Sequence, residues 1–324
     1  MPDRFGKVIV VGDACMDVHL QISDILADVQ IPYETTLGGT CGGSVAMLSR
    51  LGVPTAFLGT LGNDYAGRFI LKELTSLGVD TGLVIVKEEL NTINVYAFID
   101  EEGERHLWGF PRSEQAYPDL DMDRIDTDRI RTASWLHTSG MSMLAKGSIQ
   151  ESVPELFRIA YEAGVPTSLD LNTRVADLRL LDPKAVEAIT NTLPYVRYLT
   201  GSAKDEFYSF YPCEDYRDSI RHFAKEGRTI IARMGRDGCL LFHEGKETYI
   251  PSYQIEAKNT TGAGDCFDAG FIAATLEGRN VIEACRYASA VAAYKICGNM
   301  KNEKIDRQII EDFMNHTALR GERT

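Results

Sequence analysis

The chain has 324 residues, 44% of them hydrophobic and 25% charged, which is enough for a sizeable core in one large α/β domain or two smaller ones. Its formal net charge of −13 argues against nucleic acid or an anionic membrane as a partner, because both repel an acidic protein. Seven scattered cysteines without a C-x-x-C pair indicate reduced thiols in a cytoplasmic protein rather than a disulfide framework or a zinc site.

Residues 8–11 form a continuous apolar run that predicts a buried parallel strand and is far too short for a signal peptide or a membrane span. Asp17 follows near the C-terminal end of this strand, where open α/β sheets place their ligands, and its alternative role is that of a turn carboxylate. The glycine-rich segment 38–43 then leads into a helix that ends at Gly52. Its glycines either let a ligand approach the main chain closely or simply form a loop.

Extended segments and a regular alternation of elements follow. Residues 92–100 and 105–110 are rich in β-formers around a polar turn and predict a β-hairpin, while residues 22–37 suit a projecting pair of strands. From residue 133 onward strands alternate with helices, which predicts a doubly wound, mostly parallel sheet flanked by helices. The expected strands are 134–138, 166–169, 195–199, 229–234 and 247–255, and the expected helices are 149–163, 281–297 and 305–315.

The strongest chemical signal lies at the start of a helix, in Asn259-Thr260-Thr261-Gly262-Ala263-Gly264-Asp265. Backbone N–H groups of Gly262, Ala263 and Gly264 should point outward there and suit an anion such as a transferring phosphoryl group. Asp265 would repel that anion unless it has another task, and removal of a proton from an attacking hydroxyl is such a task. The alternative is an ordinary strand-to-helix turn in which Asp265 is an N-terminal cap.

This stretch resembles the D-T-x-G-A-G-D signature of the ribokinase-like (PfkB) carbohydrate kinases, and further motifs in the same order extend the resemblance from Val8 to about Phe313. The resemblance implies that the amides of residues 262–264 form an anion hole and that Asp265 is the catalytic base, with ATP as phosphoryl donor and Mg²⁺ as cofactor. It also implies a single ribokinase-like kinase domain over residues 1–324, with a small β-sheet lid formed by about 14–37 and 91–111. A homodimer joined through the lid is the usual arrangement in that family.

The resemblance also assigns the other candidate site residues. Those expected to bind the acceptor are Asp17, Gly38, Gly39, Gly43, Arg112 and Arg174. Arg174 ends a D-x-N-x-R turn like that of fructokinases and 2-keto-3-deoxygluconate kinases, which makes it a candidate for a negatively charged sugar acid, with Arg112 a weaker second cation. The nucleotide is expected at Gly235, Gly238, Thr261 and Asn299, and the metal at Asp205 and Glu206. Ser202 with Asp205 would serve equally well as a helix cap.

Three residues depart from the family pattern. Cys15 and Gly43 stand where the family has asparagines that contact the sugar, so the acceptor is expected to be unusual. Asn259 replaces the first aspartate of the signature, which commonly helps to bind a monovalent cation, so the use of potassium stays open.

The predicted reaction is therefore phosphoryl transfer from ATP to a hydroxymethyl group of a sugar or sugar acid. A dinucleotide-dependent dehydrogenase is excluded because Phe267 occupies the place of the third glycine in G-x-G-x-x-G, and no P-loop or protein-kinase motif is present. A nucleoside kinase of the same fold is the main alternative, because the lost sugar contacts and the aromatic residues of the lid would suit a stacked base. A catalytically silent sugar-binding protein is a further alternative, which the intact Asp265 and its amides oppose.

Overall fold

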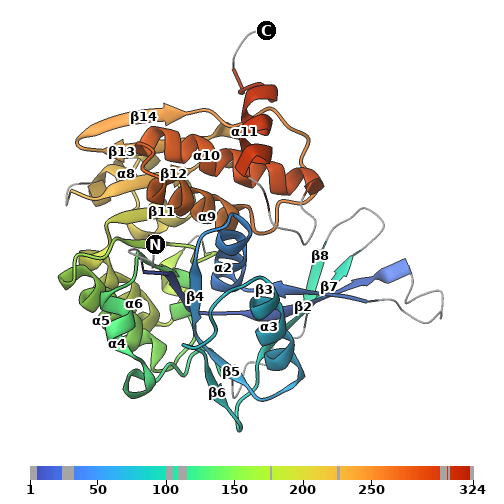
Figure 1. The fold of residues 1–324 in the computed structure, drawn as a ribbon. Helices are drawn as coiled ribbons and strands as arrows, with labels where there is room; N and C mark the ends of the chain where they lie inside the picture. Colours follow the sequence, from blue (N-terminus) through green and yellow to red (C-terminus); the bar gives the residue numbers. More distant parts are fainter. Residues whose placement is uncertain are drawn as a thin grey trace, which may run out of the picture.

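The computed structural model describes residues 6–23, 33–99, 105–108, 115–175, 177–224, 227–299, 305 and 307–321. At its centre lies an eight-stranded sheet in the order β14-β13-β12-β11-β10-β9-β1-β4 (Figure 1). All neighbours from β12 to β4 are parallel, whereas β13 and β14 pair antiparallel at one edge. The strands are β1 (Val8–Val11), β4 (Thr55–Leu58), β9 (Trp135–Ser139), β10 (Thr167–Asp170), β11 (Tyr198–Ser202), β12 (Thr229–Arg233), β13 (Cys239–His243) and β14 (Lys246–Ile250).

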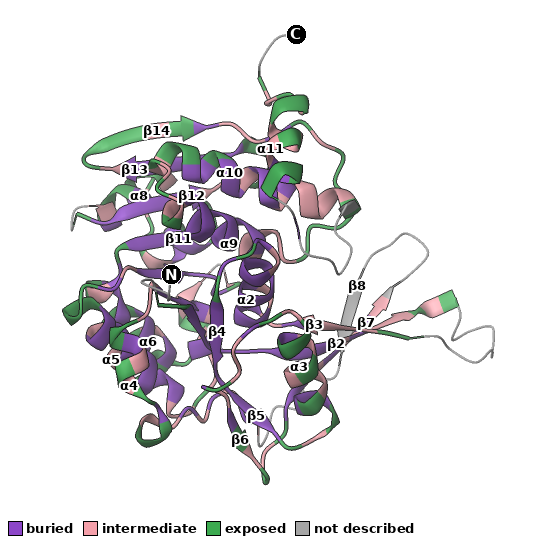
Figure 2. Ribbon diagram, in the orientation of Figure 1, coloured by how far each residue is buried: buried purple, intermediate pink, exposed green. Residues whose placement is uncertain are grey.

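Helices cover both faces of this sheet, which confirms the predicted doubly wound, mostly parallel fold. The helices of one face are α2 (Thr40–Arg50), α9 (Ala263–Leu276), α10 (Val281–Tyr294) and α11 (Arg307–His316). Those of the other face are α4 (Thr127–Arg131), α5 (Ile149–Glu162), α6 (Pro183–Thr192), α7 (Glu206–Phe210) and α8 (Tyr216–Ala224). The central strands are buried between these layers (Figure 2). In β1, Val8 and Val10 pack on the first layer and Ile9 and Val11 on the second, because alternate residues of a strand face opposite sides.

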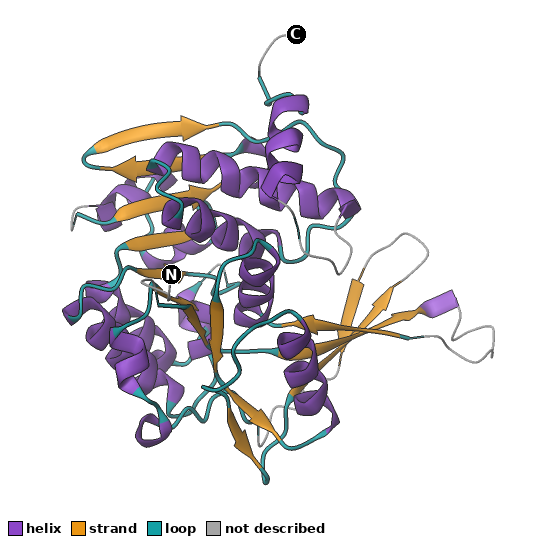
Figure 3. Cartoon of the chain, in the orientation of Figure 1, coloured by secondary structure: helices purple, strands orange, loops and turns teal. Residues whose placement is uncertain are grey.

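A four-stranded sheet projects from this body (Figure 3). Its order is β3-β2-β7-β8, formed by β2 (Cys15–Gln21), β3 (Glu34–Gly38), β7 (Ile93–Ile99) and β8 (Arg105–Trp108). The antiparallel pairing of β7 with β8 confirms the predicted hairpin. A two-stranded sheet of β5 (Thr60–Gly62) and β6 (Ile85–Lys87) and the helix α3 (Tyr65–Ser76) complete this part of the chain. No helix in the described ranges has the length and apolar composition that a bilayer crossing requires.

Three boundaries differ from the sequence prediction. β11 begins at Tyr198 rather than at residue 195, because α6 runs on into a short 3₁₀ turn, Leu193–Tyr195, whose second residue is a proline. β14 ends at Ile250, directly before Pro251, which has no N–H to donate to a neighbouring strand. α10 ends at Tyr294 and continues as a π-helical turn, Lys295–Asn299, in which Gly298 has φ 77°.

Candidate active site

The candidate site lies at the edge of the large sheet where its parallel strands end. Asp13 follows β1, Asp170 is the last residue of β10, and Arg233 is the last residue of β12. The carboxyl ends of parallel strands share one edge, and ligands of open α/β sheets bind there. The start of α9 reaches the same edge, because Arg233 forms an ion pair with Asp268 of that helix.

The backbone before α9 forms only part of the predicted anion hole. Gly262 caps the helix in the left-handed conformation, with φ 73° and no side-chain cap, which glycine adopts without strain. The N–H of Ala263 donates to Thr260 O at 3.2 Å, so the expectation that three amides are free is wrong for Ala263: its N–H closes the turn before the helix. The amides of Gly262 and Gly264 have no acceptor within the described parts of the chain and remain available to an anion.

Asp265 lies in the first turn of α9 but does not cap it, since the cap position is Gly262 and carries no side-chain bond. Its Oδ2 is 3.0 Å from the position that a Cβ would take at Gly43, so the carboxylate faces the first turn of α2. Burial, Asp170 and Asp13 raise the pKa of Asp265 to about 7, against the opposing charges of Arg233 and Arg174. A carboxylate with a pKa near neutrality is suited to act as a general base.

No sequence motif gave Arg233 a role, and the structure places it at the centre of the site. Its guanidinium lies 2.5 Å from Asp170 Oδ1 and 3.3 Å from Asp268 Oδ2, and the side chains of both aspartates are at most 3% exposed. Nη1 is also 2.9 Å from the position of a Cβ at Gly264, so the arginine borders the amides of the anion hole. One sequence feature pointed to a cation at this place. Asp268 lies three residues after Asp265 on the same side of α9, so a second carboxylate faces the site and needs a positively charged partner.

The glycine-rich turn before α2 meets Asp17. A Cβ at Gly38 would lie 2.4 Å from Asp17 Oδ2, and a Cβ at Gly39, whose φ is 85°, would lie 2.8 Å from Ala14 Cα. Gly39 therefore requires glycine for steric reasons alone, whereas a side chain at Gly38 would displace the carboxylate of Asp17. The thiol of Cys15 donates to Asp17 Oδ1 at 3.2 Å, so the residue that replaces the family's asparagine contacts the candidate acceptor carboxylate.

Arg174 is the one candidate acceptor cation that the described chain contains. It is exposed, has φ 54° and donates from Nε to Asn172 Oδ1 at 3.2 Å. Burial raises the pKa values of Asp265 and Cys15, and the charge of Arg174 opposes both shifts, which places it within electrostatic reach of the candidate base and the acceptor residues. Arg112 lies outside the described residues.

The four candidate nucleotide residues lie in turns around α9. Gly235, with φ 58°, and Gly238, with φ 86°, belong to the turn between β12 and β13, and a Cβ at Gly238 would lie 2.1 Å from Ile250 O. Packing of that turn alone accounts for Gly238. Thr261 donates its N–H to Asn259 Oδ1 at 3.0 Å, and Asn299 ends the π-helical turn after α10.

The two candidate metal residues already have partners. Ser202 Oγ donates to Asp205 Oδ2 at 2.7 Å, and Ser202 N donates to Glu206 Oε2 at 2.7 Å. The capping alternative is wrong, because Ser202 ends β11, and α7 begins at Glu206 after the cap residue Asp205 without a side-chain cap bond. Burial and Asp170 raise the pKa of Glu206 to about 7. The described residues contain no group of three His, Cys, Asp or Glu side chains arranged for a metal. This fits Mg²⁺ only in its usual phosphate-bound form, in which one or two carboxylates supplement the phosphates and water.

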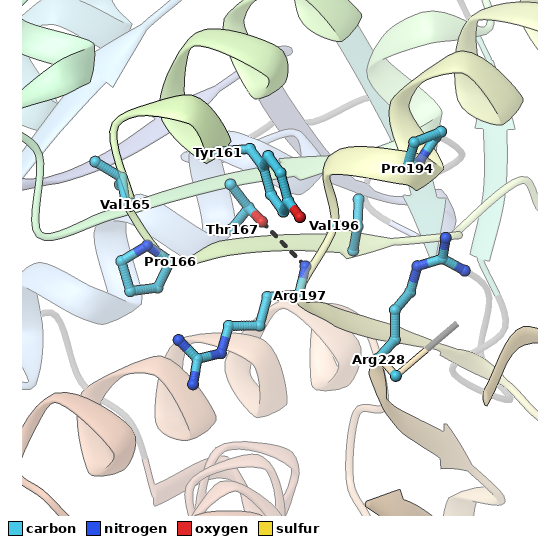
Figure 4. Close-up of a pocket in the computed structure, with 10 residues that line it drawn as sticks. Tyr161, Val165, Pro166, Thr167, Pro194, Val196, Arg197 and Arg228 are labelled. Carbon is cyan, nitrogen blue, oxygen red and sulfur yellow. Dashed lines mark hydrogen bonds between the residues drawn. The ribbon is translucent and has the colours of Figure 1, made fainter. Parts of the chain in front are cut away.

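A cavity of about 270 Å³ lies at the opposite edge of the sheet, at the amino ends of β10, β11 and β12 (Figure 4). Tyr161, Thr167 and Arg197 line it, and Thr167 Oγ accepts the N–H of Arg197 at 3.0 Å. The guanidinium groups of Arg197 and Arg228 point away from each other in Figure 4. None of the candidate site residues that the structure describes lines this cavity, and its two arginine guanidinium groups do not converge on one point.

The fold and this site define a phosphotransferase of the ribokinase-like class. Residues 6–301 match the model of the pfkB family carbohydrate kinases. An ATP-dependent ribose-1-phosphate kinase of Halopiger xanaduensis is 30% identical, over 89% of this chain and 90% of the relative. A 5-dehydro-2-deoxygluconokinase of Geobacillus thermodenitrificans is 25% identical, over 95% of this chain and 93% of the relative. A crystal structure of a putative ribokinase II from E. coli superposes with a TM-score of 0.84 at 23% identity, covering 96% of this chain and 99% of the other.

The chain belongs to the pfkB family of carbohydrate kinases. It is accordingly an ATP-dependent sugar kinase, with ATP and Mg²⁺ as cofactors and a small molecule as acceptor.

Proposed function

We propose that this enzyme transfers the γ-phosphoryl group of ATP to a hydroxymethyl group of a sugar or sugar acid, with Asp265 as general base. The observation that supports this most strongly is the position of Asp265 beside the unbonded amides of Gly262 and Gly264. Its pKa of about 7 leaves a substantial fraction of the carboxylate ionised at neutral pH. A proton acceptor, Asp265, and an anion site, the amides of Gly262 and Gly264, thus lie next to each other at the start of α9.

In the proposed reaction, Asp265 takes the proton of the acceptor hydroxyl while that oxygen attacks the phosphoryl group. The amides of Gly262 and Gly264, backed by the N-terminus of α9, stabilise negative charge on the phosphoryl oxygens. Donors of this kind typically lower a barrier by about 3 kcal/mol each. Ala263 would contribute as a third donor only after release of its bond to Thr260 O.

Mg²⁺, when bound with the nucleotide, neutralises phosphate charge, and Asp205 and Glu206 are the carboxylates we propose to support it. We assign the nucleotide to the turns that carry Gly235, Gly238, Thr261 and Asn299. Glu206 is suited to a metal-supporting role only in its ionised form, which its raised pKa makes incomplete at neutral pH.

For the acceptor we propose an anionic sugar. Asp17, against Gly38, would accept hydrogen bonds from sugar hydroxyls, and Arg174 would bind the negative group. The names of two relatives support this choice, since ribose 1-phosphate and 5-dehydro-2-deoxygluconate both carry a negative charge. Arg112 stays a second candidate for the same role. Gly43 leaves room where an asparagine would otherwise reach toward Asp265.

A nucleoside kinase is the second candidate. An aminoimidazole riboside kinase of Salmonella typhimurium is 27% identical over 91% of this chain and 88% of the relative, and the loss of the asparagine side chain at Gly43 removes one expected sugar contact. Measurement of ADP formation with neutral hexoses, sugar acids, sugar phosphates and nucleosides separates the two functions. We expect the highest kcat/KM with an anionic sugar, and a preference for nucleosides would contradict our assignment of Arg174.

The base assignment is tested by Asp265→Asn, which keeps the shape of the side chain but removes its ability to take a proton. We expect turnover to fall by about 10²- to 10⁴-fold, the usual contribution of a general base. Nucleotide binding should stay near the wild-type level, as measured by calorimetry with Mg·ADP. Near-normal turnover of this variant with the true acceptor would rule Asp265 out as the base.

We further propose that the enzyme is cytoplasmic and forms a homodimer through the small sheet. The free thiols of all seven cysteines and the projecting four-stranded sheet support these two proposals. Light scattering on the purified protein determines the oligomeric state, and a monomer at working concentrations would contradict the second proposal.

A further inference from the structure

The Thr261–Gly262 peptide is held from one side by Lys295. The Nζ of this lysine, in the first residue of the π-helical turn after α10, donates a hydrogen bond to Thr261 O. A planar trans peptide directs its C=O and its N–H in opposite directions. The contact therefore turns the N–H of Gly262 away from the lysine. That N–H is one of the two amides for which the described chain offers no acceptor.

The same end of α10 anchors the rest of the loop. Ile296 O accepts the N–H of Lys258 at 2.8 Å and that of Asn259 at 3.2 Å. The side chain of Asn259 in turn accepts the N–H of Thr261 at 3.0 Å. Residues 258–262 are thus fixed to one helix end by backbone bonds at the start and by a side-chain cation at the finish. Because the rest of the loop is held in place, the contact of Lys295 with Thr261 O orients the Thr261–Gly262 peptide, where the anion hole begins.

The charge of Lys295 also reaches the site. Its Nζ lies 3.7 Å from the position of a Cβ at Gly262. Burial and Asp265 raise the pKa of Cys266, the residue after Asp265, and the charge of Lys295 partly offsets that rise. Residue 259 is a neutral asparagine and so does not cancel this positive charge. A bound phosphoryl group would meet the positive charge behind the loop in addition to the helix N-terminus.

We infer that Lys295 is a positioning residue of the anion hole, which aims the Gly262 amide at the γ-phosphoryl group and supplies a fixed positive charge behind it. The inference rests on the proposed function. It goes beyond that function in naming a side chain outside the signature stretch that controls recognition of the terminal phosphate. Lys295 should therefore matter for ligands that carry a γ-phosphoryl group and much less for ADP.

The test compares binding of the ATP analogue AMP-PNP with binding of ADP, both with Mg²⁺, by calorimetry without any acceptor. For Lys295→Met we expect AMP-PNP affinity to fall about tenfold, as for loss of a charge-assisted hydrogen bond, and ADP affinity to change by less than about twofold. Lys295→Gln also removes the charge and should show the same selective loss of AMP-PNP affinity. The test therefore needs only one of these two variants to fold. Lys295→Arg keeps a cationic donor and should restore most of the AMP-PNP affinity.

Lys258→Met is the matched control, because it removes one positive charge from an exposed side chain of the loop that Lys295 contacts. It should keep the wild-type ratio of AMP-PNP to ADP affinity. The inference is overturned if the Lys295 variants lose affinity for both nucleotides equally, if they lose none, or if Lys258→Met has the same selective effect. A wild-type protein that bound neither nucleotide would instead overturn the proposed function itself.

Discussion

Burial of its side chain and a small group of nearby charges set the protonation state of Asp265 at neutral pH. Asp13 and Asp170 oppose its ionisation, while Arg233 and Arg174 favour it. Arg233 is itself held by Asp170 and Asp268, whose side chains are nearly inaccessible to water. One cation thus sits between two buried carboxylates and beside a third partly exposed one. Arg233, at the end of β12, thus influences the ionisation of Asp265 while it is held by Asp170 and Asp268.

The pH dependence of the enzyme should report this control. The active form of Asp265 is the carboxylate, so kcat/KM should reach half its maximum at the pKa of about 7, level off about one pH unit higher, and fall at lower pH. Arg233→Met removes a charge that lowers this pKa, so the acid limb should move to higher pH by about one unit. Measurement of kcat/KM between pH 5 and 9, roughly the window in which such a base titrates, gives the limb position.

Arg233→Lys serves as the control for that experiment, because it keeps the positive charge and should leave the limb near its wild-type position. Loss of one partner of a buried ion pair typically costs about 3–5 kcal/mol, so melting curves must confirm that Arg233→Met is folded at the assay temperature. An acid limb that does not move in a folded Arg233→Met would separate Arg233 from the ionisation of Asp265.

Gly43 offers a test of space rather than charge. A methyl group there would approach Asp265 Oδ2 to 3.0 Å, which is tight enough to displace the carboxylate. We expect Gly43→Ala to lower turnover about tenfold while the melting temperature stays equal or rises, because alanine favours the helix by about 1 kcal/mol over glycine. Gly42→Ala is the matched control, since its Cβ would meet Ala14 Cβ at 3.2 Å and not Asp265. Equal turnover of the two variants would contradict this role for Gly43.

At the scale of elements, α9 is a rigid support for its first turn. Residues 266–274 of the helix are all buried, and a Cβ at Gly270 would lie 2.9 Å from Ala288 Cα of α10. The two helices therefore approach each other closely, which a larger residue at position 270 would prevent. Because α10 also carries the turn that binds residues 258–262, the helix start and the preceding loop are positioned by one neighbour. The packing of α9 against α10 therefore fixes the positions of the anion-hole amides.

The same loop predicts how the enzyme responds to potassium. Asn259 uses its side-chain oxygen to accept the N–H of Thr261, and the ammonium of Lys295 already occupies Thr261 O. Asn259 offers no negative charge to bind a monovalent cation, and Lys295 already supplies a positive charge at Thr261 O. We expect turnover to be the same within about twofold in sodium, potassium or choline chloride at equal ionic strength. Stimulation by potassium well above that level would show that an ion binds here despite Asn259.

At the scale of the whole molecule, the parallel sheet gathers residues that are far apart in the chain. Asp13, Asp170 and Arg233 each end or follow a different strand, and the parallel arrangement of those strands brings their carboxyl ends to one edge of the sheet. Strand–helix alternation predicted the sheet correctly because buried strands such as β1 are short apolar runs. The ends of elements were less predictable, as at Tyr198 and Tyr294, where proline and glycine effects on neighbouring turns decide the boundary.

The sequence by itself determined the class of fold and the stretch around Asp265, because hydrophobic periodicity and a local glycine pattern are legible without distant contacts. Only the tertiary structure decided which charges surround that carboxylate, that the Ala263 amide is already bonded, and that Lys295 reaches Thr261 O. Arg233 and Asp170 are separated by 63 positions and Lys295 and Thr261 by 34. Such pairings arise from strand order and helix packing, which depend on long-range contacts that no local pattern records.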